Sequence, residues 1–276
     1  MKNKLSALLL ATSLVCGSSQ AVILYDQDIT PDVIFGSGNA NGSFTTEQNN
    51  GIELGLRGKL RHNAAGQPEN TFNSNGDGTY SFNAGVAPTQ SAPTAQWSFE
   101  WSINSDYSGD DNFNFMLADL SFVLGLDTDP SLSTDFLTFD LIHGIEPIAN
   151  SVCWDHSMGD NGTGNGAGTE VSGCRSADAG VAAAATAAYA TNLTDFNVAQ
   201  NSWKPHWFIP GFDPTIDATY DFYLAAFDAQ GQQLARTQIQ IIVGSGGATQ
   251  VPAPTPLLLL GIGLLAVLLS RKRVFS

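Results

Sequence analysis

Residues that could carry out chemistry are present, but their spacing matches none of the common catalytic sites. The four histidines do not form the His-Glu-x-x-His pattern that holds a catalytic zinc ion on a helix. The chain has neither a Gly-x-Ser-x-Gly turn for a nucleophilic serine nor a glycine-rich phosphate loop. With 26 acidic residues, any carboxylate pair chosen for glycoside hydrolysis would be arbitrary. We therefore expect no enzyme, and keep a secreted hydrolase with a non-standard site as an alternative.

Cys153 and Cys174 form an even pair if Cys16 leaves with the N-terminal segment described below. In an oxidising compartment such a pair predicts a disulfide. The bond would close the loop between positions 153 and 174, which corresponds to about 3 kcal/mol of stabilisation. The alternative is a Cys153 thiol nucleophile with His156 as its base, but exported proteins seldom keep a thiol free.

A second group of residues could contact a polysaccharide. Trp203 and Trp207 lie in a short aromatic segment and could stack on sugar rings, although such residues more often anchor a core or a loop. Arg57, Lys59 and Arg61 alternate, so a strand would place all three on one face. Two interpretations of that face stay open: a solvated surface paired across the sheet with acidic side chains, or a contact for an anionic polysaccharide.

Calcium is the one cofactor that the sequence leaves open, and no position is assigned to it. Residues 73–78 offer oxygen ligands at alternate positions, but the twelfth place of a helix-loop-helix calcium site holds Ala84 where a glutamate is required. We therefore interpret residues 75–78, Asn-Gly-Asp-Gly, as a turn before a strand. The carboxylates that could still converge in loops are those of Asp106, Asp110, Asp111, Asp127 and Asp129.

Composition limits the classes of protein and of partner. The 276 residues are 43% hydrophobic and 13% charged, which is typical of a globular chain. Gly 28 and Pro 12 indicate many turns and few long helices. Lys+Arg 11 against Asp+Glu 26 gives a net charge of −15, which disfavours nucleic acid as a partner.

Alternation of apolar and polar side chains predicts the fold class. It runs through residues 97–104 and 220–224, as in half-buried strands. Residues 220–227 and 233–243, joined by turn residues 228–231, predict a β-hairpin. Further strands are expected at 22–25, 51–60, 79–82, 115–126 and 136–142. About eight strands at this spacing predict an all-β fold, an antiparallel β-sandwich of the jelly-roll or Ig-like kind.

One segment departs from the alternation. Residues 181–190 are mostly alanine and predict a short helix that caps one end of the sandwich or packs across a sheet edge. Residues 244–247, Gly-Ser-Gly-Gly, predict a flexible linker. The expected organisation is a sandwich domain over 22–243 and a linker over 244–250.

The N-terminal segment predicts a secretory signal peptide. Lys2 and Lys4 precede an apolar run over 5–15, and small residues precede a cleavage point after Ala21. The alternative is a lipoprotein box ending at Cys16, but Val15 is bulkier than the small residue that such a box requires. Export of the domain follows from this prediction.

The C-terminal segment has three consecutive parts. The first part is a proline motif, Val251, Pro252, Ala253 and Pro254. The second is an apolar stretch over residues 257–269, and the third is a basic terminus, Arg271, Lys272 and Arg273. A hydrophobic helix is expected over about 256–270, roughly 20 Å long and hence short for a bilayer. The basic terminus should stay cytoplasmic, which leaves the domain on the outer side of the membrane.

This tail resembles the PEP-CTERM sorting signal of Gram-negative bacteria, the substrate of exosortase-type membrane proteases. It differs where the usual acidic residue between the prolines is Ala253. Three body segments, 32–45, 70–82 and 199–203, also resemble a family of uncharacterised secreted proteins that carry such tails. The alternative for the tail is an ordinary membrane anchor.

The resemblance implies a protein held in the inner membrane through its C-terminal helix before processing, then released to the cell surface or the medium. An exosortase-type protease is the expected partner, together with an exopolysaccharide. We expect a structural or adhesive component of a biofilm or exopolysaccharide matrix. A carbohydrate-binding module is the first alternative, and its expected contacts are Trp203, Trp207 and the Arg57 to Arg61 face.

Overall fold

The computed structural model describes residues 22–109, 114–144 and 150–248. The expected signal peptide, the tail motif with its hydrophobic helix, and Asp110 and Asp111 therefore lie outside the described residues. Within the described ranges, no helix is both long enough and apolar enough to cross a membrane.

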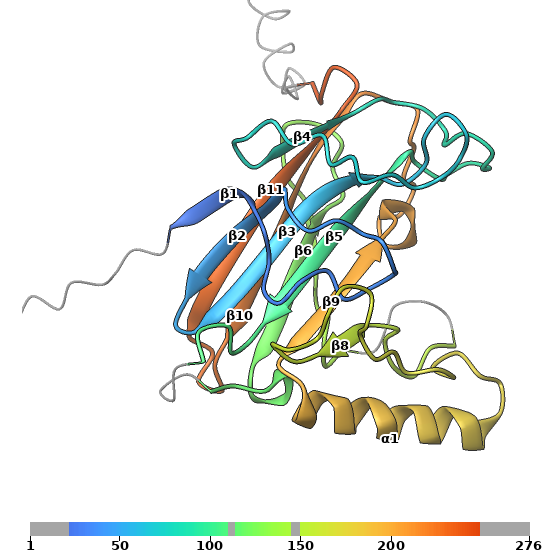
Figure 1. Cartoon of the computed structure of the whole chain (residues 1–276). Helices are drawn as coiled ribbons and strands as arrows, with labels where there is room; N and C mark the ends of the chain where they lie inside the picture. Colours follow the sequence, from blue (N-terminus) through green and yellow to red (C-terminus); the bar gives the residue numbers. More distant parts are fainter. Residues whose placement is uncertain (1–21, 110–113, 145–149, 249–276) are drawn as a thin grey trace, which may run out of the picture.

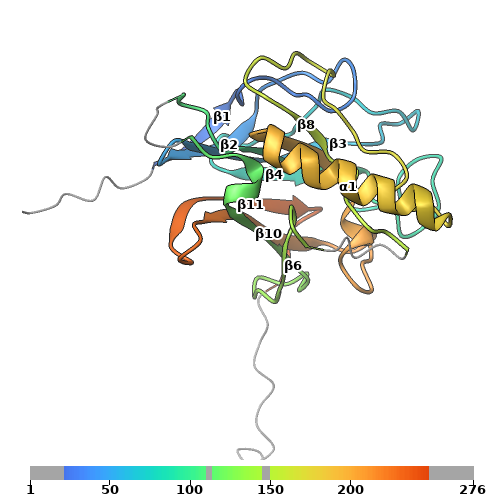
Figure 2. The same cartoon turned by 90° about the horizontal axis from the view of Figure 1, so that it is seen from below.

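The described strands form two sheets (Figure 1). Sheet A has the order β1 (Ile23–Gln27), β2 (Phe44–Asn49), β3 (Ile52–Leu60), β5 (Trp97–Asn104), β9 (Val198–Trp203) and β8 (Ser157–Gly159). Sheet B has the order β4 (Thr79–Phe82), β11 (Gln233–Val243), β10 (Ala218–Phe227), β6 (Ser121–Asp127) and β7 (Phe136–Asp140). The two sheets lie one over the other in a sandwich-like arrangement (Figure 2).

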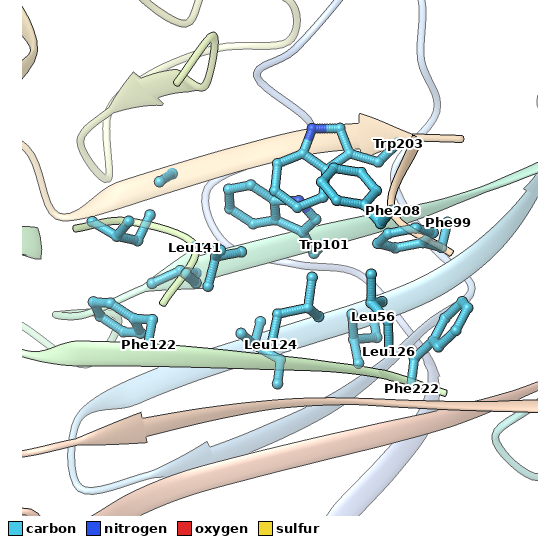
Figure 3. Close-up of a cluster of buried hydrophobic side chains, with 14 of the residues drawn as sticks. Leu56, Phe99, Trp101, Phe122, Leu124, Leu126, Leu141, Trp203, Phe208 and Phe222 are labelled. Carbon is cyan, nitrogen blue, oxygen red and sulfur yellow. The ribbon is translucent and has the colours of Figure 1, made fainter. Parts of the chain in front are cut away.

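Aromatic and aliphatic side chains fill the space between the sheets (Figure 3). The alternating residues of β5 supply one wall, with Trp97, Phe99 and Trp101 all buried. Phe99 meets Phe222 of β10 with 5.0 Å between ring centroids. The predicted inward face of residues 97–103 is therefore confirmed, and its burial is the main source of stability.

The predicted hairpin is confirmed: β10 and β11 pair antiparallel from Ala218 opposite Val243 onward. The predicted turn over residues 75–78 is also present: the Asn75 N–H donates to the Thr79 carbonyl at 2.9 Å, and β4 begins at Thr79. However, β4 and β11 run parallel, with Tyr80 beside Ile241, so sheet B is mixed. The expectation of a wholly antiparallel fold was wrong, since this pairing joins segments far apart in the chain.

Three strands, β2, β8 and β9, fall outside the predicted set. The sequence of β9, Val-Ala-Gln-Asn-Ser-Trp, shows no clear alternation, because outward Val198 is apolar and outward Gln200 is polar, and both are fully buried. The strand expected over 115–126 begins only at Ser121, and a 3₁₀ turn, η1 (Leu117–Asp119), precedes it.

The alanine-rich helix is present and longer than predicted, as α1 (Ala179–Asp195). Asp178 caps its N-terminus by accepting from the backbone N–H groups of Gly180 and Val181, at 2.8 and 3.1 Å. Tyr189, on the buried face of the helix, donates to the carbonyl of Ile142 at 2.8 Å. Both views place α1 beside the β8 edge of sheet A (Figures 1 and 2).

The predicted disulfide between Cys153 and Cys174 is present, and both residues are buried. It closes the loop that carries β8, next to the hydrogen bond from the Val152 N–H to the Cys174 carbonyl at 2.8 Å. A free Cys153 thiol with His156 as its base is therefore wrong for this structure. Burial also lowers the pKa of His156 to about 4, and its Nε2 lies 2.7 Å from the Leu141 carbonyl.

Candidate functional site

Arg57 and Lys59 lie on the outer face of sheet A, but solvent does not reach them. Register places Arg57 opposite Glu100 of β5, with Nη2 and Oε2 2.6 Å apart. The Lys59 ammonium lies 3.4 Å from the other oxygen of the same carboxylate. All three side chains are at most 2% exposed, so the expected solvated face or glycan contact at Arg57 and Lys59 was wrong. Only the expected cross-strand pairing with an acid is found.

A covering segment, residues 28–43, explains this burial. This segment connects β1 to β2 in the chain and crosses the outer face of sheet A (Figure 1). Nη1 of Arg57 donates to the carbonyls of Ala40 and Gly42 at 3.0 and 2.6 Å. The rings of Phe44 and Phe72 pack on the guanidinium, with centroids 4.0 and 3.8 Å from its carbon. Arg57 therefore fastens the covering segment to the sheet.

Parts of segments 32–45, 70–82 and 199–203 meet at this covered face. Gln200 of β9 donates to the Asp32 carbonyl and accepts from the Ile34 N–H, both at 2.8 Å. Asn70 donates to the carbonyl of Gly38 at 2.9 Å. Segments 32–45, 70–82 and 199–203 thus contact one another, and these contacts hold distant parts of the chain together.

Trp203 is also unavailable to a ligand, because it is only 3% exposed. It lies opposite Phe99 on the inward side of β9, and its ring packs 4.7 Å from Phe208 and 5.3 Å from Trp154, centroid to centroid. The expectation that Trp203 offers a face to a sugar was therefore wrong, and the alternative of a core anchor is found.

Trp207 and Arg61, by contrast, remain at the surface and come together with residues that the sequence did not single out. β3 ends at Leu60 and β9 ends at Trp203, and both strands pair with β5 near its start. The chain continuing from each strand therefore emerges at the same end of sheet A. We name the residues gathered there the basic end: Arg61, His62, Lys204, His206 and Trp207. Trp207 is 44% exposed.

Positive charge at the basic end is not balanced by acidic neighbours. Burial, and then the Arg61 guanidinium, lower the pKa of Lys204. Burial also lowers the pKa of His62 and of His206, and the Lys204 ammonium adds to both shifts. Among the described residues, neither Arg61 nor Lys204 forms an ion pair. The fold therefore holds like charges together without compensation.

Geometry at the basic end combines a cation with a flat apolar surface. Nζ of Lys204 lies 5.8 Å from the centroid of the Trp207 ring, and the His206 ring lies 6.1 Å from the same indole. Nε2 of His62 and Nδ1 of His206 are buried without a hydrogen-bond partner in the described structure. Such a group can bind an anion that also carries an apolar face and hydroxyl groups.

A cavity of about 510 Å³ adjoins the basic end. The carbonyl of Gln96, which lines it, accepts from the N–H groups of Arg61 and His62 at 2.8 and 2.9 Å. Phe82 and Leu60 supply apolar surface. The polar side chains around this amide-lined cavity are those of Asn63, Glu69, Asn73, Asn83 and Gln96.

The acidic loops do not assemble a metal site in the part of the chain that is described. No group of three or more His, Cys, Asp or Glu residues there is placed to hold a metal ion. Asp127 is buried, and its Oδ1 accepts from the N–H groups of Asp129 and Asp135 at 3.0 and 2.8 Å. Its carboxylate thus organises the loop that follows β6.

No known protein identifies the site by similarity: no family model matches the chain, and no curated protein or solved structure matches it either. Sequence reasoning found Trp207 and Arg61 but missed Lys204, His62 and His206. Lys204 and His206 flank Trp207 in the same short segment, which was the available signal. The approach of His62 depends on the β3, β5 and β9 pairing, which no local pattern reveals.

Proposed function

We propose that this chain is an exported protein of a Gram-negative bacterium, sorted through its C-terminal segment, that acts as a structural or adhesive component at the cell surface or in the exopolysaccharide matrix. The observation that carries the proposal is the Cys153–Cys174 disulfide. It uses both cysteines that follow residue 21, and disulfides of this kind persist in oxidising compartments.

Residues 1–21 and 251–276 support the same proposal from the sequence. Between them lie six of the 11 basic residues and all 26 acidic ones, so the exported domain has a formal charge of −20. We propose that an exosortase-type protease recognises the Val-Pro-Ala-Pro motif while the hydrophobic segment holds the chain in the inner membrane. The basic residues that stop transfer in this proposal are Arg271, Lys272 and Arg273.

The fold suits a non-catalytic role in this setting. We propose that the two sheets form a sandwich of the jelly-roll or Ig-like kind, without choosing between them. A disulfide-closed domain with buried polar and apolar layers would resist local unfolding, and with it proteolysis, outside the cell.

A carbohydrate-binding module is the second candidate. The observation that favours it is the amide-lined cavity next to Arg61 and His62, at the end of sheet A that also exposes Trp207, because planar amides and an indole are the groups that bind sugar hydroxyls and ring faces. This function is compatible with adhesion to a matrix, and it concerns what the exported domain contacts.

The test is intact mass and fractionation of the chain from its host, with and without the exosortase gene. A species that lacks residues 1–21 and the segment after Pro256, found at the surface or in the medium only with exosortase, supports the proposal. A double substitution, Pro252→Ala with Pro254→Ala, should retain the chain in the inner membrane, whereas Thr255→Ala should not. A species ending at Ser276 in the inner membrane of both strains would refute sorting.

A further inference from the structure

The basic end is the one place where the described domain exposes clustered positive charge. The domain has six basic residues between positions 22 and 250, and two of them, Arg57 and Lys59, are buried against Glu100. Arg175 lies 3.9 Å from Asp155, and Arg236 packs on the Tyr223 ring at 4.0 Å. The two that remain are Arg61 and Lys204, which follow the ends of β3 and β9 at the same end of sheet A. A domain of net charge −20 therefore keeps two like charges together, an arrangement that an anionic ligand would relieve.

His62 provides an independent observation that points to a ligand. Its side chain is only 7% exposed, and its Nδ1 lies 3.4 Å from the Gly66 carbonyl. A proton on Nδ1 makes Nε2 an acceptor, and this buried Nε2 has no partner among the described residues. Buried acceptors normally have a donor, and this one lies beneath the surface of the basic end, so a ligand hydroxyl would reach it after a neighbouring side chain moves.

Trp207 adds the third requirement, a flat apolar surface beside the charge. The indole is 44% exposed while the Lys204 ammonium lies 5.8 Å from its centroid. A sugar ring can lie against the indole while a substituent on the ring reaches the ammonium. The amide-lined cavity offers amide groups to further sugar units, together with the Glu69 carboxylate.

We propose that the basic end binds a carboxylated sugar of an acidic polysaccharide, with Lys204 and Arg61 at the carboxylate and Trp207 against the ring. The indole distinguishes this ligand from a free inorganic anion. The proposal rests on the proposed function only for the source of the polysaccharide.

The test is titration of the oxidised full chain, in neutral detergent, with an oligogalacturonate followed by calorimetry. The matched ligand is the methyl ester of the same oligomer, which keeps the rings and removes the charge. We expect binding of the acid that weakens with added salt, and at least about tenfold weaker binding of the ester. Equal binding of acid and ester would overturn the role of the charges.

Substitutions locate the site. Lys204→Gln and Trp207→Ala should each weaken binding about tenfold, whereas Arg175→Gln and Arg236→Gln, which remove the same charge elsewhere, should change it less than about twofold. Circular dichroism and thermal unfolding check that each variant folds. Equal losses in all the charge variants would overturn the proposed location and indicate a general charge effect.

Two further outcomes would also overturn the proposal. If the basic end binds an acidic loop of a second copy, sedimentation will show a dimer that Lys204→Gln dissociates, and the oligogalacturonate will not bind. If neither occurs, the site does not bind this class of ligand. Because binding is measured on purified chain, a correctly sorted chain that fails to bind refutes only this inference, and a binding chain that is not sorted refutes only the proposed function.

Discussion

Glu100→Gln is the sharpest test of how the covering segment is held. The substitution keeps the size of the side chain and removes the carboxylate that forms ion pairs with Arg57 and Lys59. Nε of Arg57 donates to the carboxylate at 2.7 Å, in addition to the 2.6 Å contact of Nη2. Both cations stay buried after the change and lose their ion-pair partner.

The expected magnitude follows from the fate of the two cations. Lys59 can lose its proton, because burial already lowers its pKa. Arg57 keeps its charge, although the carbonyls of Ala40 and Gly42 still accept from Nη1. Breaking a buried pair by removing one partner costs about 3–5 kcal/mol. For a domain of this size the melting temperature should fall by about 10 °C.

Urea unfolding of the oxidised chain at pH 7 measures the change, with Asp195→Asn at an exposed position as the control. A double-mutant cycle with Arg57→Gln should give a coupling of at least about 1.5 kcal/mol. Proteolysis should become faster within residues 28–43. A loss below about 1 kcal/mol for Glu100→Gln, with unchanged proteolysis of that segment, would refute the fastening role of the buried charges.

Three smaller predictions concern the rest of the domain. Replacing Cys153 and Cys174 by serine should lower the free energy of unfolding by about 3 kcal/mol, measured against the wild type with and without reductant. Asp178→Ala should cost about 1 kcal/mol and reduce the helical signal in circular dichroism, because α1 loses its cap. The lowered pKa of His156, about 4, favours the neutral ring in the folded state. This preference contributes about 3 kcal/mol to the free energy of unfolding above the ordinary pKa of about 6.5, and the contribution is lost as pH falls toward 4. His156→Gln should therefore reduce the change of the urea midpoint between pH 7 and pH 4.5.

Local patterns predicted the parts of the fold in which one side of a strand is apolar. The β10–β11 hairpin and β5 follow a period of two. The reason is that their apolar side chains point to the core on one face, while their polar side chains lie on the other face. The helix was found through its alanines, and the disulfide through the even cysteine count. In each case the determining interaction lies within a short segment or follows from composition.

Patterns failed where a distant segment covers a strand. Gln200 is fully buried because its amide bonds the backbone of the covering segment, so β9 has a polar residue at an outward position that solvent does not reach. The parallel pairing of β4 with β11 has the same origin, since it depends on which distant strand arrives beside Tyr80. No property of these residues alone specifies their neighbours.

Arg57, Lys59 and Arg61 show how one pattern leads to two different outcomes. All three have the same parity along the chain, yet the first two are buried against Glu100 and the third is not. β3 ends at Leu60, and the contacts of residues 39–42 reach only as far as Lys59. Arg61 therefore emerges where the cover and the carboxylate are both absent, and the end of β9 brings Lys204 to the same place. The boundary of the candidate binding site is thus set by where the covering segment stops. Arg57 and Lys59, before Leu60, fasten the fold, whereas Arg61, after Leu60, stays available to a ligand.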